Sequence, residues 1–303
     1  MALNRALFTK QLNLGLNTVF GMEYDRYPEQ WREIYSTEQS QKAFEEDVQM
    51  IGFGAAPTKA EGAAVSYESG REGFVSRYVH ETIALAFSIT EEAEEDGLYG
   101  SLGAKYARAL ARSMQHTKEI KGANILNNAT NTAQLGGDGV TLLNSSHPLG
   151  GGGTASNILA TPADLSETSL ETLLIQISEA EDDRGIPIAL TGQKLIVPPN
   201  LVFIAERILK SNLRPGTADN DINAMRNMGM IPGGVVVNQR LTDTDQYFIM
   251  TDCPDGMKHF VRAPIKKAVE GDFETGNLRY KVRERYSFGF TDWRAVYGSQ
   301  GAD

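Results

Sequence analysis

A helical pattern from about residue 90 to residue 129 constrains the fold of this chain most. Apolar residues recur along it at close to helical spacing, acidic residues crowd its start, and basic residues gather in its second half, as the helix dipole favours. At about 1.5 Å per residue, such a helix is roughly 60 Å long. Because most helices in globular proteins are much shorter, the pattern predicts an elongated subunit. Gly97, Gly100 and Gly103 lower the helix propensity near its start and predict a bend there.

The chain before this helix has two parts, and neither has a core of its own. Residues 1–53 contain two short helical patterns joined by irregular chain, and they are too polar between their apolar clusters to fold alone. Residues 54–89 alternate apolar with small or polar side chains at 63–67, 74–79 and 82–89, which predicts a long two-stranded ribbon. Since an isolated ribbon is marginally stable in water, we expect both parts to lie on another surface, most simply a neighbouring subunit.

The remainder of the chain predicts a mixed α+β body. A Gly-rich polar stretch at 134–162 leads into a helix at 166–183, and a strand at 186–197 leads into a helix at 199–209. Residues 210–234 have the composition of a loop. The strands expected after this loop lie at 235–238, 247–252, 259–262 and 277–290. No internal repeat and no heptad array is present in the sequence.

The composition excludes several classes of protein. Asp and Glu outnumber Lys and Arg by 39 to 29 and give a net charge of −10, whereas a protein that grips nucleic acid normally carries a basic excess. Such acidity is compatible with containing DNA without adhering to it. A single cysteine, Cys253, excludes an intrachain disulfide framework and a cysteine-cluster metal site. The sequence has no apolar run of about 18 residues and no signal-peptide pattern, so we expect no membrane association.

Two motifs could carry chemistry, and both have a simpler interpretation. The glycines at 150–153 are not followed by a lysine and are not preceded directly by an apolar strand, so they do not match a phosphate-binding loop. Ser145, Ser146 and His147 place a nucleophile beside a base, but no nucleophile-elbow pattern surrounds them. We therefore expect no catalytic, cofactor-binding or metal-binding residues. A nucleotide-binding enzyme that uses the Gly-rich loop is the alternative from another class.

Charged and aromatic residues of the ribbon are the candidates for contacts between subunits. These candidates are Lys59, Arg71, Arg77 and Tyr78. Lys59 could in principle form an isopeptide crosslink, but the sequence identifies no partner for it, so a surface lysine is the default interpretation. Lys281, Arg283 and Arg285 alternate along the last predicted strand. They could meet phosphates, although a solvated or intersubunit charged face is the commoner role of such a pattern.

Local motifs in the last third of the chain, together with one earlier segment, resemble those of a known family. The segments are Phe273–Tyr280 (FETGNLRY), Glu284–Arg294 (ERYSFGFTDWR), and Leu142–Leu149 (LLNSSHPL) with its glycine run. They resemble tailed-bacteriophage major capsid proteins of the Hong Kong 97 fold, and within them the Mu-like major head subunits. The resemblance implies an N-terminal arm (1–53), an extended loop formed by the β-ribbon (54–89), a peripheral domain with a spine helix (90–189), an axial domain (190–264) and a return to the peripheral domain (265–303).

The same resemblance implies a function. Subunits of this family self-assemble into hexamers and pentamers of an icosahedral head that encloses double-stranded DNA, so the expected location is the virion capsid, after assembly in the host cytoplasm. Separate scaffolding, portal and decoration proteins are the expected partners, and Met1 close to the arm favours a scaffold encoded apart. One sequence must occupy non-equivalent places in hexamers and pentamers. The Gly-rich helix start and the 210–234 loop would supply the flexibility of the subunit that this requires. An encapsulin-type nanocompartment shell is the alternative on the same fold.

Overall fold

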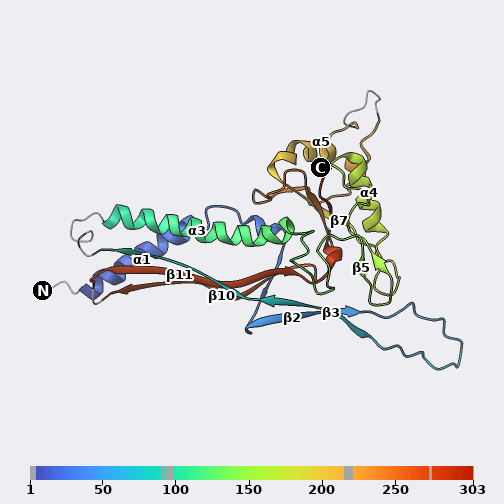
Figure 1. Cartoon of the computed structure of the whole chain (residues 1–303), viewed down its shortest axis with the longest axis horizontal. Helices are drawn as coiled ribbons and strands as arrows, with labels where there is room; N and C mark the ends of the chain where they lie inside the picture. The colour runs from blue at the N-terminus through green and yellow to red at the C-terminus, as the bar shows by residue number, and fades with distance from the viewer. Residues whose placement is uncertain (1–4, 91, 93–98, 215–220, 273–274, 303) are drawn as a thin grey trace.

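A computed structural model describes the chain except residues 1–4, 91, 93–98, 215–220, 273–274 and 303. The molecule is elongated, as the long helical pattern predicted (Figure 1). One end holds two long helices on a long sheet, the other end holds a mixed α+β body, and a hairpin projects away from both. No helix in the described ranges has the length and apolar character that a membrane span requires.

The long half is a four-stranded sheet with two helices on one face. The strand order is β1 (Ser36–Gln39), β10 (Met257–Gly271), β11 (Leu278–Phe290) and β4 (Glu81–Ile89), with β1 parallel to β10 and the other pairs antiparallel. Helices α1 (Arg5–Tyr24) and α3 (Tyr99–Asn127) cover one face. Their shared core contains Leu16 and Phe20 from α1, Leu110 and Met114 from α3, and Tyr280 and Val282 from β11.

Helix α3 is continuous from Tyr99 to Asn127, so Gly100 and Gly103 do not interrupt it. Gly103 is buried, and a Cβ at this position would lie 3.5 Å from a carbon of Ile89 and 3.6 Å from one of Leu16. Both distances are ordinary van der Waals contacts, so an alanine would also fit at this position. Gly97 and most of the predicted acidic start lie outside the described residues.

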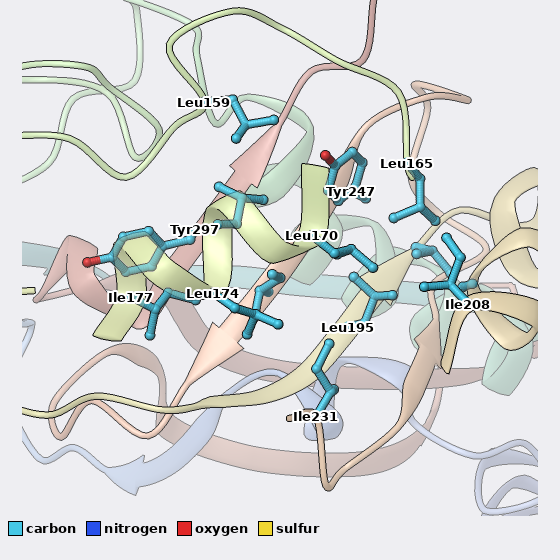
Figure 2. Close-up of a cluster of buried hydrophobic side chains, with 14 of the residues drawn as sticks. Leu159, Leu165, Leu170, Leu174, Ile177, Leu195, Ile208, Ile231, Tyr247 and Tyr297 are labelled. Carbon is cyan, nitrogen blue, oxygen red and sulfur yellow. The ribbon is translucent and has the colours of Figure 1, made fainter. Parts of the chain in front are cut away.

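The body is built on a second four-stranded sheet. Its order is β12 (Val296–Ser299), β9 (Tyr247–Thr251), β7 (Gly192–Val197) and β8 (Val235–Val237), and it packs against α4 (Glu167–Ser178), η2 (Pro199–Leu201) and α5 (Val202–Lys210). Ser166 caps α4 by accepting a hydrogen bond from the Ser169 backbone N–H. Leu170, Leu174 and Ile177 of α4 point into the core that Figure 2 shows. The apolar face predicted for this helix is thus confirmed.

Several predicted boundaries in the body move for local reasons. Helix α4 ends at Ser178 and β7 begins only at Gly192, because residues 182–186 form a tight turn with Gly185 at φ +75°. The predicted loop at 210–234 contains a short helix, α6 (Ala224–Met228), which is capped by the Asn223 side chain. Small elements complete the chain: η1 (Gln30–Glu33), η3 (Trp293–Ala295) and the two-residue strands β5 (His147–Pro148) and β6 (Thr154–Ala155).

Strand β10 is far longer than the strand predicted at 259–262. Its outer half mixes lysine, alanine and glutamate with Ile265 and Val269, which hides the apolar period. Lys267 lies on the covered face, where its Nζ is 4.8 Å from the centroid of the Phe20 ring and donates to the carbonyl of Asn17 at 3.2 Å. Because the aliphatic stem of this lysine covers apolar surface, the residue occupies a position where hydropathy would predict solvent.

The ribbon differs from the one predicted. The projecting hairpin consists of β2 (Phe44–Ile51) and β3 (Arg71–Val79), so its first strand comes from the range expected to form the arm. The predicted strand at 63–67 is wrong, because those residues are exposed and have no partner strand. The predicted continuation at 82–89 leaves the ribbon and becomes β4 of the long sheet. Cross-strand apolar pairs, Phe44 with Val79 and Val48 with Val75, favour the observed register.

Candidate assembly site

The hairpin β2–β3 projects from the subunit and ends in a tip without regular structure, residues 52–70 (Figure 1). Every residue from 55 to 70 is exposed. The tip still carries large apolar side chains, with Phe53 62%, Val65 62% and Tyr67 96% exposed. Since side chains of this kind gain free energy only when they leave water, the tip is suited to contact another surface.

The base of the hairpin, in contrast, is fixed to the subunit by a buried polar cluster. Asp47 of β2 accepts hydrogen bonds from Lys258 Nζ at 2.5 Å and from Thr291 Oγ1 at 2.6 Å. The hydroxyl of Tyr78 lies 2.7 Å from Thr291 Oγ1 and donates to it, because the Thr291 proton is used on Asp47. The cluster therefore joins both strands of the hairpin to the start of β10 and to Thr291, the residue after β11.

Lys258 carries the positive charge of this cluster although its side chain is only 6% exposed. Asp255 and Glu38 add carboxylate oxygens at 2.8 and 3.5 Å from its Nζ. Burial alone would disfavour the ammonium, but the hydrogen bonds to Asp255 and Asp47 outweigh it and raise the pKa of Lys258 above its usual range. The lysine thus stays charged and keeps the three acidic groups together.

A second set of contacts fixes the direction of the hairpin. Gln49 of β2 donates to Asp183 at 3.4 Å and to Asp292 at 3.3 Å, and buried Arg294 pairs with both carboxylates at 3.3 Å. Farther out, Arg184 forms an ion pair with Glu68 and donates to the carbonyl of Ser69 at 3.3 Å. The hairpin is thus tied to the body at its base and along one side of its tip.

The structure places three of the four predicted contact residues on the surface of this hairpin. Lys59 lies in the exposed tip and Arg71 is the exposed first residue of β3. Arg77 is exposed on β3, with its guanidinium 4.0 Å from the centroid of the Phe44 ring and 3.9 Å from Glu46. Tyr78 is different: it is 3% exposed and packs edge-on against Phe260 at 4.8 Å. Its side chain serves packing within its own subunit.

Sequence reasoning missed the apolar outer face of the hairpin. Phe44, Met50, Val75 and Val79 are 37%, 68%, 44% and 63% exposed, and they lie on the face that carries Arg77. The sequence signal for this strand was the recurrence of apolar side chains at every second position near 44–51, and the acidic run Glu45–Asp47 obscured it. This face adds apolar surface to the tip and extends the candidate assembly site along the full length of the hairpin.

The two motifs considered for catalysis have structural roles. The N–H of Gly150 donates to the carboxylate of Asp183 at 3.3 Å, and a Cβ on Gly151 would lie 2.1 Å from the Asp183 carbonyl oxygen. The Gly-rich loop thus packs on an acidic residue, which disfavours a phosphate there. His147 is buried while Ser145 and Ser146 are exposed, so no nucleophile meets a base. Within the described ranges, no group of acidic, histidine or cysteine residues is arranged to hold a metal ion.

Sequence comparison decides what kind of protein carries this hairpin. A profile of the family described as phage capsid protein matches residues 74–299. The chain belongs to this phage capsid protein family. Its members are structural components of viral capsids rather than enzymes, which places this chain among major capsid proteins and supports a location in the virion capsid. A search of curated proteins finds no match.

Solved shells share the fold of this capsid protein at low sequence identity. The virus-like particle from Pyrococcus furiosus matches with a TM-score of 0.55 and 14% identity over 94% of this chain and 98% of that chain. A chain of Mycobacterium phage Che8 matches with a TM-score of 0.54 and 15% identity over 90% and 92%. The SrpI encapsulin from Synechococcus elongatus matches with a TM-score of 0.51 and 11% identity over 91% and 88%. The mixed helix and sheet fold of this chain is therefore the HK97-like capsid fold.

Proposed function

We propose that this capsid protein self-assembles into the hexamers and pentamers of an icosahedral phage head that encloses double-stranded DNA, as a relative of the Mu-like head subunits. The observation that carries the proposal is the hairpin, whose base is clamped to the subunit while its tip exposes Tyr67 almost completely. A free monomer gains nothing from such a tip. Copies that bury it against one another gain the free energy of apolar burial.

The division of the chain into parts follows from this function. The arm (1–53), extended loop (54–89), peripheral domain (90–189), axial domain (190–264) and returning segment (265–303) would each occupy a distinct place in the shell, with two corrections from the fold: the projecting loop begins at β2 inside the arm range, and β4 belongs to the long sheet. Lys59, Arg71 and Arg77 would then contact neighbouring subunits, because they share the exposed surface of the hairpin. Assembly would take place in the host cytoplasm with separate scaffolding, portal and decoration proteins.

The net charge of −10 fits the enclosed cargo. A shell that held its DNA by basic contacts over the whole inner surface would resist packaging and release, whereas an acidic subunit repels the phosphate backbone on average. DNA would accordingly be confined by the shell and not bound in a sequence-specific way.

A protein nanocompartment is the second candidate function, because the fold of an encapsulin also matches this chain. The content of the particles separates the two functions. Particles purified from infected or induced cells are treated with nuclease, and their protected content is then extracted. Double-stranded DNA of genome length is the expected result. Particles that hold one folded cargo enzyme and no nucleic acid would overturn the proposal in favour of the compartment.

A further inference from the structure

The uncovered face of the long sheet carries a strip of basic residues. Helices α1 and α3 cover one face of this sheet, and no described segment covers the other face along its outer half (Figure 1). On that open face Lys266 of β10 and Lys281 and Arg283 of β11 are exposed, and Arg285 next to them is half-buried. We call these four residues the basic strip. None of them forms an ion pair within the described part of the chain.

The register of the strands brings like charges together. Lys266 lies directly opposite Arg283 in the β10–β11 ladder, and Lys281 follows two residues away on the same face. Like charges in directly opposite positions of an antiparallel pair destabilise the sheet. Arg279, the next residue on this face of β11, is neutralised: it forms an ion pair with Asp272 and lies opposite Glu270. Along the outer half of the sheet, the positive charge without an acidic partner therefore lies in the basic strip.

The surface beside the strip is flat. On β4, Ala84 lies opposite Arg283 and Ala86 lies opposite Lys281, and both alanines are exposed. Ala268 of β10 lies on the other side of Lys281 and is also exposed. Small side chains on both sides of a row of cations permit the close approach of another protein surface.

We propose that the basic strip is an interface for an acidic surface of a second copy of this chain. This inference rests on the proposed self-assembly. Copies with a net charge of −10 repel one another, and a contact that sets the excess acid of one copy against a cationic surface of the next offsets this repulsion. The basic strip provides that cationic surface, and contact with carboxylates also relieves the repulsion between Lys266 and Arg283.

Charge reversal tests the interface. In the double variant Lys281→Glu/Arg283→Glu, the contact changes from attractive to repulsive, and we expect the yield of shells to fall at least about tenfold. The matched control is Lys105→Glu/Arg108→Glu, which changes the net charge equally at exposed positions of α3. The charge-conserving variant Lys281→Arg/Arg283→Lys should assemble as the unmodified chain does. Shell yield is measured by sedimentation and electron microscopy at low and at high salt.

The stability of the variant subunit separates loss of the interface from loss of the fold. A carboxylate in place of Arg283 faces Lys266, so the variant monomer should melt at the same temperature as the unmodified monomer or above it. Unchanged shell yield in the charge-reversed variant, or equal loss in the α3 control, would overturn the interface while leaving self-assembly intact. Normal shells that retain less DNA would overturn it as well and would assign the strip to the phosphate backbone. Absence of shells from the unmodified chain would instead refute the proposed function.

Discussion

Nδ1 of His147 lies 2.6 Å from Oδ2 of Asp138, in a place where the histidine is fully buried. Nε2 of the same ring lies 3.1 Å from Oδ1 of Asn157. That amide oxygen must accept, because the Asn157 Nδ2 donates to the carbonyls of Leu142 at 2.7 Å and Val296 at 2.9 Å. Both ring nitrogens of His147 therefore face hydrogen-bond acceptors.

The hydrogen-bonded pair of His147 and Asp138 stabilises the junction between the Gly-rich segment and the end of the chain. The His147 ring stacks on Trp293 at 4.2 Å with an angle of 9° between the planes. We expect Asp138→Ala to cost about 1–3 kcal/mol of unfolding free energy, because it leaves the buried Nδ1 of His147 without its hydrogen-bond partner. The double variant with His147→Phe, which keeps the stacked ring, should recover part of that loss. Urea unfolding measures both, and simple additivity of the two substitutions would contradict a direct coupling.

His259 gives the protein a predictable weakness in acid. Its ring lies between Trp31 and Phe288 at 4.4 Å from each. Burial, with help from Lys118 and Arg32, lowers its pKa from 6.5 to about 3. Because the unfolded chain takes up this proton below about pH 6.5 and the folded subunit does so only near pH 3, stability is complete above pH 6.5 and falls as the pH decreases. The loss attributable to His259 reaches up to about 4 kcal/mol at the acid end of this window.

The variant His259→Phe isolates this contribution, since it keeps an aromatic ring and cannot take up a proton. Its unfolding free energy should decline less between pH 7 and pH 4 than that of the unmodified subunit, measured by urea titration at each pH. Other buried groups titrate equally in both proteins and cancel in the difference. Parallel curves for the two proteins would show that His259 has no part in the acid sensitivity.

Adjacent residues of β3 separate folding from assembly. Tyr78 points into the subunit and Arg77 points out of it. We expect Tyr78→Ala to cost about 3–5 kcal/mol of stability through the cavity that it leaves. Arg77→Ala should change the stability of the subunit by less than about 0.5 kcal/mol, as is usual for surface positions, but should lower the yield of shells. Thermal melting and sedimentation of both variants check this, and full shell yield with Arg77→Ala would remove that residue from the assembly site.

The tip of the hairpin can be removed without disturbing its clamped base. Deleting residues 55–69 leaves a short glycine-containing loop between Ile51 and Arg71, which already pair. The melting temperature of the subunit should remain within a few degrees of the original, because the deleted residues are exposed, while shells should no longer form. Electron microscopy of the deletion variant decides the point, and particles of normal size and number would show that the tip is dispensable.

Sequence patterns predicted the elements whose apolar period is complete. The α4 face of Leu170, Leu173, Leu174 and Ile177 follows the 3.6-residue period, and all four residues are buried. Strand β11 alternates from Leu278 to Tyr286 and was predicted almost to its ends. In both elements, a single buried face determines the apolar pattern, so the sequence is sufficient to predict the element and its buried residues.

The ribbon and the buried polar clusters could not be predicted in the same way. Strand β2 has acidic residues at 45–47, and half-buried Asp47 is neutralised by Lys258, which lies more than 200 residues away in the sequence. The basic strip shows the opposite case, since the alternation of Lys281 and Arg283 was visible but the facing Lys266 was not. Charges that depend on distant partners have no local period, and only the fold brings them together.

Negative-stain electron microscopy of the purified, expressed chain tests the central claim most directly. Closed shells of uniform diameter, with rings of six and five subunits resolved in class averages, are the predicted result. The same preparation should contain few free subunits once the exposed tip and the outer face of the hairpin are buried between copies. A folded, cooperatively melting protein that remains monomeric at every concentration and ionic strength, and with or without crowding agents, would contradict a shell-forming subunit.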